Sequence, residues 1–381
     1  MGKVLRVGID GLSEPAATGT GGLVYLKNIA RALCEVGSGS SEIVIFTSET
    51  NAHVFRDISD KAKIFRSRWL SERLPFRVFS QQVVLPFLAT KFSLDALLCP
   101  GNIVPVLGAP RPIVIVQNRL QYDLPVELGR IRRSYRRYLG YLSLIRAKKI
   151  ITLSEDTSHY LGEALHVPEN RRVVIPSGVD HQLFFVRNGL SRESSRHADF
   201  LVVSELWPYK NHEVVFRALA RCCKNADFSG RLVLVGGDWK NRKQSLKRLA
   251  TDLGIAGRVD FVGRVPHDQM PMVYARSSAL LFPSLAECFP LPVLEAMACG
   301  VPVIASNRCS FPELVGDAGT CIDPHDEKAW ADAICRVMSD KELRSRMIER
   351  GLNRARQYTW RAAGEKLLEV LYEAVQENGS G

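Results

Sequence analysis

The chain has 381 residues, of which 46% are hydrophobic and 24% charged, and its formal net charge is +11. This length exceeds one ordinary hydrophobic core and predicts two domains, while the composition is that of a globular protein. No apolar run reaches about eighteen residues and the N-terminal MGKVLRVGIDG lacks a long apolar core, so we expect neither a membrane-spanning helix nor a secretion signal.

The positive surplus favours anionic partners, which are nucleotide phosphates, an acidic membrane surface or nucleic acid. Nine cysteines are scattered through the chain, and none belongs to a Cys-x-x-Cys pair. Buried free thiols in a reducing cytosol fit this pattern better than disulfides or a zinc site. We therefore expect a cytoplasmic protein, and a second expectation is that it attaches peripherally to the inner face of the membrane.

Short apolar runs rich in β-forming residues alternate with helical stretches in the first half of the chain. Most of these runs are continuous rather than alternating, which is typical of parallel strands buried on both faces. The expected strands are residues 4–10, 42–48, 95–101, 112–118, 148–154 and 171–178.

Gly21 and Gly22 follow the first expected strand and, with Gly19, lead into a helix that has an apolar face. A glycine-rich loop at a helix start can cradle phosphate, so we place these residues in a loop for acceptor or phosphate. The pattern is not a full Gly-x-Gly-x-x-Gly fingerprint and no Walker lysine follows it.

Gln117, Asn118 and Arg119 stand at the carboxyl end of the expected strand 112–118. Their side chains can hydrogen-bond a sugar. We therefore place all three on the acceptor side, with Asn118 as a candidate catalytic residue.

Two stretches are basic and carry aromatic residues. Residues 129–149 contain eight basic residues and no acid, and an apolar stripe follows one side of the expected helix; residues 61–77 are similar. One interpretation is a packed helix with a solvated basic face; the other, which we favour, is a surface that faces anionic phospholipid or a lipid-diphosphate acceptor. Nucleic acid is not expected, because no nucleic-acid motif accompanies the charge.

The second half repeats the pattern after a polar stretch, 187–199, that we interpret as a linker. Its expected strands are residues 199–205, 231–237, 258–264, 278–284 and 301–306. An alternating βα series predicts an α/β fold of two Rossmann-like, doubly wound domains, with ligands in a central cleft at the carboxyl ends of the strands. The expected domains are 1–188 and 189–358, and an amphipathic helix in 359–381 is expected to cross back to the first.

Three residues at strand ends of the second half are candidates for phosphate contacts. Lys210 lies between a strand and a helix, where a lysine acts as a point charge on a diphosphate. Arg264 ends the expected strand 258–264 and either adds positive charge or is a surface arginine. Gly236 belongs to a glycine pair that we expect to line the same site, although such pairs are common at strand ends.

The stretch LAECFPLPVLEAMACGVPVIAS, residues 285–306, places Glu287 in a loop and Glu295 near the start of a helix. Pro292 suits the first turn of that helix and Gly300 suits its end. The helix start would attract an anion such as a diphosphate. The two glutamates are either a capping acid and a surface acid or ligands for the hydroxyls of a ribose and a sugar, and the local sequence leaves both interpretations open.

The segment ECFPLPVLEAMACGVPVIAS resembles the Glu-x7-Glu signature of retaining glycosyltransferases of family 4, which have the GT-B fold. The match continues through ACGVP, and the resemblance covers the whole chain, with its strongest part at 199–320. It implies that Glu295 binds the nucleotide ribose and that Glu287 binds the donor sugar.

The resemblance also shows departures from the family pattern. Lys210 matches the lysine of the family's Gly-Arg-Leu…Lys element, but Glu205 stands where an arginine is common. Pro290 replaces a common glycine and cannot donate a backbone N–H, so the amides of Phe289 and Leu291 remain as donors to the sugar nucleotide.

Three further assignments are implied by the resemblance. The segment FVGRVP resembles the strand end whose backbone packs against the base, which places Val265 there. The loop of Gly21 and Gly22 borders the donor phosphates and the acceptor in the family. Many relatives carry a His-Asp pair where this chain has Gln117 and Asn118, so we expect a local substitution of role.

We therefore expect a retaining, metal-independent glycosyltransferase that moves a hexose of mannose or glucose type from a nucleoside-diphosphate sugar to a glycan or lipid-linked acceptor. The first domain would bind the acceptor and the second the donor, while Lys210, Arg264 and the helix start stabilise the departing nucleoside diphosphate. No cofactor is expected, and no Asp-x-Asp triplet is present for a metal.

Two alternatives stay open. One is a noncatalytic or divergent GT-B protein that binds nucleotide sugars, and the other is a GT-B-like epimerase or phosphorylase. The base, the sugar, the linkage and the oligomeric state are not predicted.

Overall fold

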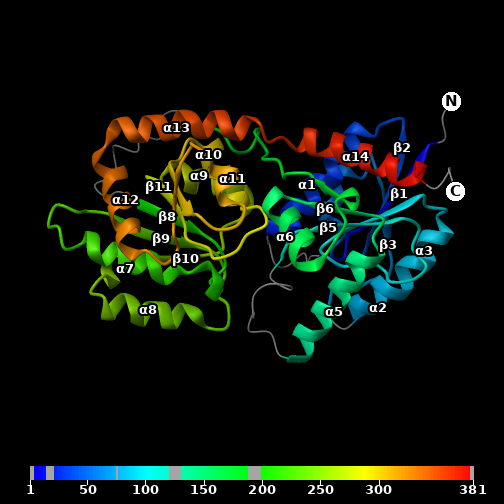
Figure 1. The fold of residues 1–381 in the computed structure, drawn as a ribbon, viewed down its shortest axis with the longest axis horizontal. Coiled ribbons are helices and arrows are strands. Elements are labelled where there is room, and N and C mark those ends of the chain that lie inside the picture. Colours follow the sequence, from blue (N-terminus) through cyan, green and yellow to red (C-terminus); the bar gives the residue numbers. More distant parts are fainter. Residues whose placement is uncertain (1–3, 14–20, 74–75, 120–129, 188–198, 378–381) are drawn as a thin grey trace. The chain divides into compact units, whose positions relative to one another are not determined.

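The protein consists of two compact units. A computed structural model describes residues 4–13, 21–73, 76–119, 130–187 and 199–377, without the side chains of 130–135. One unit comprises Met1–Gly178 together with Thr359–Gly381, and the other comprises Val179–Tyr358. The division falls at Gly178, ahead of the expected linker at 187–199, most of which lies outside the described residues (Figure 1).

The first unit contains a parallel sheet of seven strands, counted over the described residues, in the order β3-β2-β1-β4-β5-β6-β7. The order runs outward from β1 in both directions, which is the doubly wound arrangement that the sequence predicts. The strands are β1 (Leu5–Asp10), β2 (Ser41–Thr47), β3 (Lys63–Arg66), β4 (Ala96–Pro100), β5 (Pro112–Val116), β6 (Lys149–Thr152) and β7 (Arg172–Val174).

The second unit repeats this arrangement with a parallel sheet in which six strands are described, in the order β10-β9-β8-β11-β12-β13. The strands are β8 (Asp199–Val203), β9 (Arg231–Val235), β10 (Val259–Gly263), β11 (Ala279–Phe282), β12 (Val303–Ser306) and β13 (Thr320–Ile322). The predicted fold class, α/β with two doubly wound sheets, is therefore confirmed.

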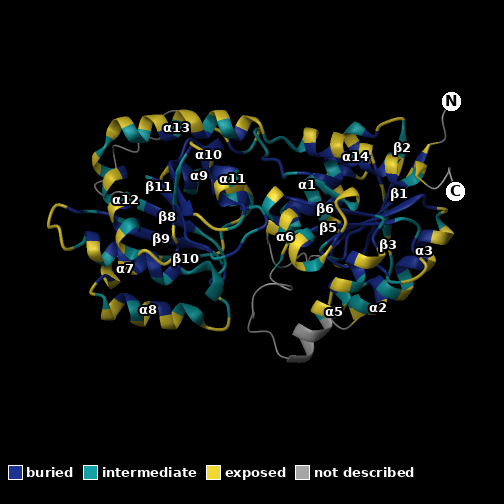
Figure 2. Ribbon diagram, viewed as in Figure 1, coloured by how far each residue is buried: buried dark blue, intermediate teal, exposed yellow. Residues whose placement is uncertain are grey.

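Helices cover both faces of the second sheet, as continuous apolar strands require. Phe200 and Val202 of β8 face a core that includes side chains of α7, α8 and α12, whereas Leu201 faces a core that includes side chains of α9, α10 and α11. Figure 2 shows the strands buried between these layers. The helices are α7 (His212–Cys222), α8 (Arg242–Asp252), α9 (Met270–Ala275), α10 (Leu291–Ala298), α11 (Phe311–Val315), α12 (Glu327–Ser339) and α13 (Lys341–Arg356).

The last helix of the chain, α14, packs on α1 in the first unit. The rings of Tyr25 and Trp360 meet edge to face with their centroids 5.5 Å apart. A Cβ on Gly364 would lie 2.9 Å from the Cβ of Ala32, so glycine lets the two helices approach closely. The helices of this unit are α1 (Gly21–Val36), α2 (Phe76–Phe79), the π-helical η3 (Ser80–Val84), α3 (Leu85–Lys91), α5 (Arg130–Arg146), α6 (Glu155–Leu165) and α14 (Trp360–Gln376).

Short 3₁₀ helices complete the described structure: η2 (Ala52–Ile58), η4 (Glu169–Arg171), η5 (Pro208–Lys210), η6 (Ala256–Arg258) and η7 (His267–Gln269). All eleven predicted strands are present, while β3 and β13 were not predicted. Nine free thiols are found, five of them buried. Among the described helices, none combines the length and the apolar character needed to cross a membrane.

Candidate functional site

Four neighbouring strands of the second unit, in the order β10, β9, β8 and β11, end at the same edge of their sheet. The segments that follow these strands carry Arg264, Gly236, Lys210 and Glu287 in the same order. Because parallel strands point their carboxyl ends in one direction, the sheet brings four predicted site residues to one side of this unit.

Lys210 and Glu287 form an ion pair, and their side chains are only 13% and 15% exposed. The hydroxyl of Ser284 donates a hydrogen bond to Oε1 of Glu287 at 2.8 Å, and that of Ser310 donates to its carbonyl oxygen at 3.1 Å. Burial alone would lower the pKa of Lys210, but Glu287 and Tyr209 outweigh it and raise that pKa above its ordinary value. The ammonium group is therefore charged at neutral pH, and the loop holds its partner in place.

Arg264 and Glu205 form a two-pronged ion pair. Nε and Nη2 of Arg264 donate to the two carboxylate oxygens of Glu205 at 2.9 and 3.1 Å, and the N–H of Gly237 donates to Oε1 at 3.2 Å. The hydrogen bonds to Glu205 raise the pKa of Arg264. Glu205, which departs from the family's arginine, thus anchors the arginine that follows β10.

The turn after β9 requires glycine at position 236. Gly236 has a φ of +153°, and a Cβ there would lie 1.9 Å from the carbonyl oxygen of Ser204. Its N–H donates to the carbonyl oxygen of Gly263 at 2.9 Å. The backbones that follow β8, β9 and β10 therefore approach each other closely at this edge.

Glu295 of α10 is 7% exposed, and both of its carboxylate oxygens accept a hydrogen bond. The Tyr274 hydroxyl donates to Oε2 at 2.8 Å, and Nε2 of His267 lies 3.0 Å from Oε1. Burial raises the pKa of Tyr274 well above its ordinary value, so the phenol stays protonated. Burial would lower the pKa of His267, but Glu295, with Asp180 and Asp268, raises it above its ordinary value.

Helix α10 begins and ends where the sequence predicts. Pro292 lies in its first turn, and Gly300 follows its end with a φ of +66°. No side chain caps the helix start, where Pro290 occupies the N-cap position. The Phe289 ring lies 5.7 Å from that of Tyr358, and the residue is half-buried within its own unit.

Leu291 is buried at the start of α10, and Val265 is partly buried against the core that α9, α10 and α11 share. Any contact that these two residues make with a sugar nucleotide must therefore come mainly from their backbones. The backbone roles that the family resemblance implies for them stay predictions.

The acceptor-side residues belong to the first unit. Oδ1 of Asn102 accepts hydrogen bonds from the N–H groups of Gln117 at 2.9 Å and of Asn118 at 3.4 Å, which fixes the segment after β5. Nη1 of Arg119 lies 2.6 Å from Oδ2 of Asp156, and the arginine side chain is 12% exposed. Arg119 is thus engaged in holding α6, whereas Asn118 is exposed.

Gly21 and Gly22 open α1, and a Cβ on Gly21 would meet nothing within 4 Å. Gly19 lies outside the described residues, as do residue 129 and the side chains of 130–135 in the basic stretch 129–149. The structure therefore describes only the helix end of the predicted glycine loop.

Sequence reasoning missed several groups around the site. His267 and Tyr274 were overlooked because His267 lies just beyond the motif FVGRVP and Tyr274 lies in an apolar run that is typical of a core helix. Trp207 and Trp239 stack with their centroids 4.4 Å apart beside the loops after β8 and β9. No spacing rule links two tryptophans so far apart in the sequence.

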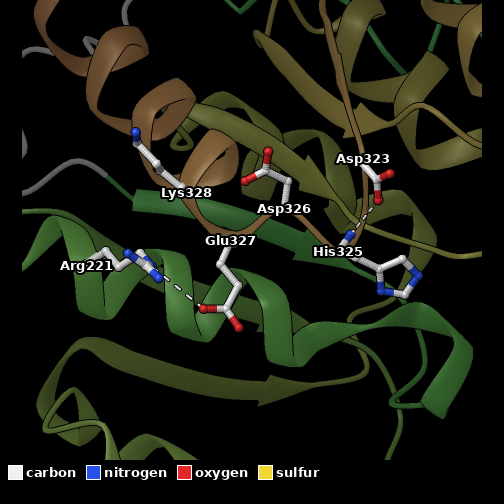
Figure 3. Close-up of a pocket in the computed structure, with 6 residues that line it drawn as sticks. All are labelled: Arg221, Asp323, His325, Asp326, Glu327 and Lys328. Atoms are coloured by element: carbon white, nitrogen blue, oxygen red, sulfur yellow. Dashed lines mark hydrogen bonds and ion pairs between the residues drawn. The ribbon is translucent and has the colours of Figure 1, made fainter.

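An open depression of about 510 Å³ lies elsewhere on the second unit (Figure 3). Its acids are already engaged: Asp326 caps α12, Asp323 accepts a hydrogen bond from its own loop, and Glu327 lies 3.7 Å from Arg221. It contains no predicted site residue and is not the candidate site. Within the described ranges, no group of three or more His, Cys, Asp or Glu residues could hold a metal ion.

Two family models match the chain. Residues 19–183 match the model of Glycosyltransferase Family 4, and residues 191–354 match that of Glycosyl transferases group 1. The chain belongs to the family 4 glycosyltransferases. The second match spans every residue of the edge described above, and the first spans Gln117, Asn118 and Arg119.

Curated relatives of this glycosyltransferase act on different acceptors. It is 27% identical to the D-inositol 3-phosphate glycosyltransferase of Corynebacterium glutamicum over 73% of this chain and 69% of that protein. It is 26% identical to the O-antigen chain mannosyltransferase RfbU of Salmonella typhimurium over 86% of this chain and 90% of that protein.

Solved structures resemble this glycosyltransferase over nearly its whole length and show its fold to be GT-B. Sucrose-phosphate synthase from Thermosynechococcus elongatus has a TM-score of 0.79 at 20% identity, with 97% of this chain and 98% of that chain covered. Anabaena HepE in complex with UDP and glucose has a TM-score of 0.74 at 18% identity, with 97% and 100% covered.

Proposed function

We propose that this glycosyltransferase is a retaining, metal-independent enzyme that moves a hexose of mannose or glucose type from a nucleoside-diphosphate sugar to a glycan or lipid-linked acceptor. We place the donor on the second unit and the acceptor on the first, and we place the enzyme at the inner face of a membrane. The mannosyltransferase among its relatives supports the sugar class, and the neighbour that holds UDP and glucose supports the donor class.

The observation that carries this proposal is the set of three acid-containing clusters on the second unit. Lys210 pairs with Glu287, Arg264 pairs with Glu205, and Glu295 is held by hydrogen bonds. Acids suit the hydroxyls of ribose and sugar, and the two cations suit a diphosphate. The Lys210–Glu287 pair is the part of this set that a purely structural role explains least well, because burying two charges carries a desolvation penalty that a buried apolar pair does not carry.

We propose a task for each group during transfer. As the bond between the sugar and the diphosphate breaks, negative charge grows on the leaving phosphate, and the ammonium of Lys210 moves from Glu287 to this charge. Glu205 fixes the guanidinium of Arg264, which removes the entropy cost of ordering it when the diphosphate binds. Glu287, released from Lys210, then accepts hydrogen bonds from the sugar.

The test is hydrolysis of radiolabelled UDP-, GDP- and ADP-hexoses by the wild type and by Lys210→Ala and Glu287→Ala. Loss of one oriented charge in such a site lowers kcat by about a hundredfold or more. Arg350→Ala is the control, because this exposed arginine pairs with Asp317 on another part of the same unit. Equal turnover in all four proteins would refute the site assignment.

The nucleotide is identified by thermal shift with UDP, GDP and ADP. A ligand at a hundredfold excess over its Kd stabilises the native state by about 2.7 kcal/mol. We expect one base to give the largest shift, and Glu295→Ala to abolish that shift. A shift that persists in the variant would place the nucleotide elsewhere.

A noncatalytic protein that binds nucleotide sugars is the alternative. It is favoured by the segment after β5, where Gln117 and Asn118 stand in place of the family's His-Asp pair and Arg119 is engaged with Asp156. This alternative predicts a thermal shift with a nucleoside diphosphate but no hydrolysis or transfer of any donor.

A further inference from the structure

An exposed apolar surface lies on the first unit, on elements that carry none of the predicted site residues. Phe76, Phe79, Val83 and Phe87 lie along the continuous helical stretch formed by α2, η3 and α3, and each is more than half exposed. Their spacing of three and four residues places them on one side of this stretch. Trp69 and Leu107 are 63% and 74% exposed. We call these six residues the apolar face.

The exposure of the apolar face is not a failure of packing, because the same helical stretch buries polar side chains. Ser80 is fully buried and Gln81 is 4% exposed. Nε2 of Gln81 donates a hydrogen bond to Oδ2 of the buried Asp10 at 2.6 Å. This stretch buries Leu85 and Leu88 as well, so it places apolar side chains on its outer side in addition to its inner side, unlike an ordinary surface helix. Such an arrangement indicates a partner for the outer side.

Hydrogen bonds hold both loops of the apolar face against this helical stretch. The hydroxyl of Ser80 donates to the carbonyl oxygen of Trp69 at 3.0 Å. Nε2 of Gln82 donates to the carbonyl oxygen of Val104 at 3.1 Å, and the N–H of Val106, next to Leu107, donates to Oε1 of Gln82 at 2.9 Å. The apolar face is therefore a fixed surface.

Helix α5 is joined to the same loop. The N–H of Val104 donates to the hydroxyl of Ser143 of α5 at 3.0 Å, and the carbonyl oxygen of Val104 accepts from Gln82 of η3 at 3.1 Å. Tyr138, Tyr141 and Ile145 of α5 are exposed as well. Their spacing again follows one side of a helix.

The charge around the apolar face is strongly positive. Residues 61–92 contain seven lysines and arginines and a single acid, Glu72. Glu72 is 8% exposed and accepts hydrogen bonds from the hydroxyls of Ser48 and Thr50, so it does not offset the surface charge. The basic residues that are exposed here and on α5 are Lys61, Lys63, Arg66, Arg68, Arg73, Lys91, Arg137 and Arg146.

We infer that the apolar face, with its surrounding arginines and lysines, docks on an anionic lipid surface. Exposed Trp, Phe and Tyr side chains suit the headgroup region of a bilayer, and basic residues are attracted by anionic lipids. A second copy of the chain would bring the same cations together, which opposes self-association through this face. The inference specifies the membrane partner of the proposed function but does not depend on transfer activity.

The apolar face differs from the surface that the sequence indicates. The stretches 61–77 and 129–149 contain the charge, but the helical stretch that carries most of the apolar side chains runs on to residue 91. Only the structure shows that Val83 and Phe87 are exposed.

The test is co-sedimentation of the full chain with vesicles of phosphatidylcholine alone and of phosphatidylcholine with about one third phosphatidylglycerol. We expect binding to the anionic vesicles that weakens as salt is raised, because the Debye length shrinks. Phe76→Ser/Phe87→Ser should reduce that binding by about tenfold or more, and Arg68→Ala/Arg73→Ala should reduce it and its salt dependence. Both Phe side chains are about two-thirds exposed, so these variants should fold.

Phe185→Ser/Val262→Ser is the matched control, because these exposed apolar residues belong to the second unit. The control should bind vesicles like the wild type. Light scattering of the free protein tests self-association, and hydrolysis of a soluble donor tests the proposed function separately. The inference is overturned if the wild type ignores anionic vesicles, if Phe76→Ser/Phe87→Ser binds them as well as the control, or if that variant merely converts a dimer into a monomer.

Discussion

Replacing Tyr274 by phenylalanine removes one hydroxyl from the centre of the second unit and tests how Glu295 is held. The hydroxyl lies 2.8 Å from Oε2 of Glu295, and both residues are buried. The substitution leaves the ring in place, so the packing around it is retained. The perturbation is therefore the loss of one hydrogen bond to a buried carboxylate.

The magnitude follows from the charge of the acceptor. A hydrogen bond to a charged group contributes about 1.5–3 kcal/mol, so we expect Tyr274→Phe to lower the free energy of unfolding by about 2 kcal/mol. For a unit of this size, that loss corresponds to a fall in Tm of about 4–8 °C. Tyr372→Phe is the control, because its hydroxyl donates at 2.9 Å to the carbonyl oxygen of Ser40, a neutral acceptor, and should cost about 1 kcal/mol.

The assay is urea unfolding of both variants at pH 7, followed by nucleotide binding. Because Glu295 loses one of its two supports, Tyr274→Phe should weaken binding of a nucleoside diphosphate more than binding of its 2′,3′-dideoxy counterpart. A loss of stability under about 0.5 kcal/mol would refute the reasoning about Glu295, since changes of that size are common on the surface. Equal weakening for the two nucleotides would refute a role at the ribose while leaving the stability result intact.

Three further predictions concern pH and backbone geometry. Burial lowers the pKa of His212 from its ordinary value of 6.5 to about 3 in the folded protein. The free energy of unfolding should therefore fall by about 1.4 kcal/mol for each pH unit below pH 6.5, and His212→Gln should flatten this slope in urea titrations. The pKa of His267 is raised beside Glu295, so the stability difference between the wild type and His267→Gln should be largest below pH 6.5 and should disappear as the pH rises through the raised pKa. Gly236→Ala should destabilise by about 3 kcal/mol because its Cβ would strike a carbonyl oxygen, whereas Gly257→Ala, which has open space, should be neutral in thermal unfolding. The first prediction is contradicted if the stability of the wild type does not change in acid. The second is contradicted if the stability difference between the wild type and His267→Gln grows with pH, and the third if the two glycine substitutions have equal effects.

The central strands were predictable because each is a continuous apolar run, and burial on both faces requires such runs. The two missed strands, β3 with the sequence KIFR and β13 with TCI, lie at opposite ends of their sheets' strand orders. An edge strand pairs on one side only and is partly exposed, so its sequence can be short and mixed. The limits of α10 were predictable because Pro292 and Gly300 act through their own backbones.

The pairing of side chains in the candidate site was not predictable in the same way. The sequence marks Lys210 and Glu287 as separate ligands, yet the structure joins them, because strand order brings the ends of β8 and β11 together. Glu205 departs from the family pattern, and its partner Arg264 lies two strands away. Such contacts depend on the order of strands in the sheet, which local spacing does not encode.

Exposure of apolar residues was also beyond the sequence. Tyr138 and Ile145 follow a helical stripe that fits a packed face, but both are exposed, while Ser143 and Leu144 of the same helix are buried. A hydrophobic stripe defines a face and does not say what covers it. The neighbouring elements decide that question, and here it is Val104 that meets Ser143.

The return of α14 to the first unit has a consequence for how the chain matures on the ribosome. The second unit is one continuous segment, so all of its residues have been synthesised once Tyr358 has emerged. Helix α1 can pack against α14, with Gly364 next to Ala32, only after α14 has been synthesised. Domains usually fold in the order of their synthesis, but here we expect the second unit to be completed before the first. A nascent chain halted before Thr359 would therefore expose the surface of α1 that α14 normally covers, which makes that intermediate a natural client for chaperones.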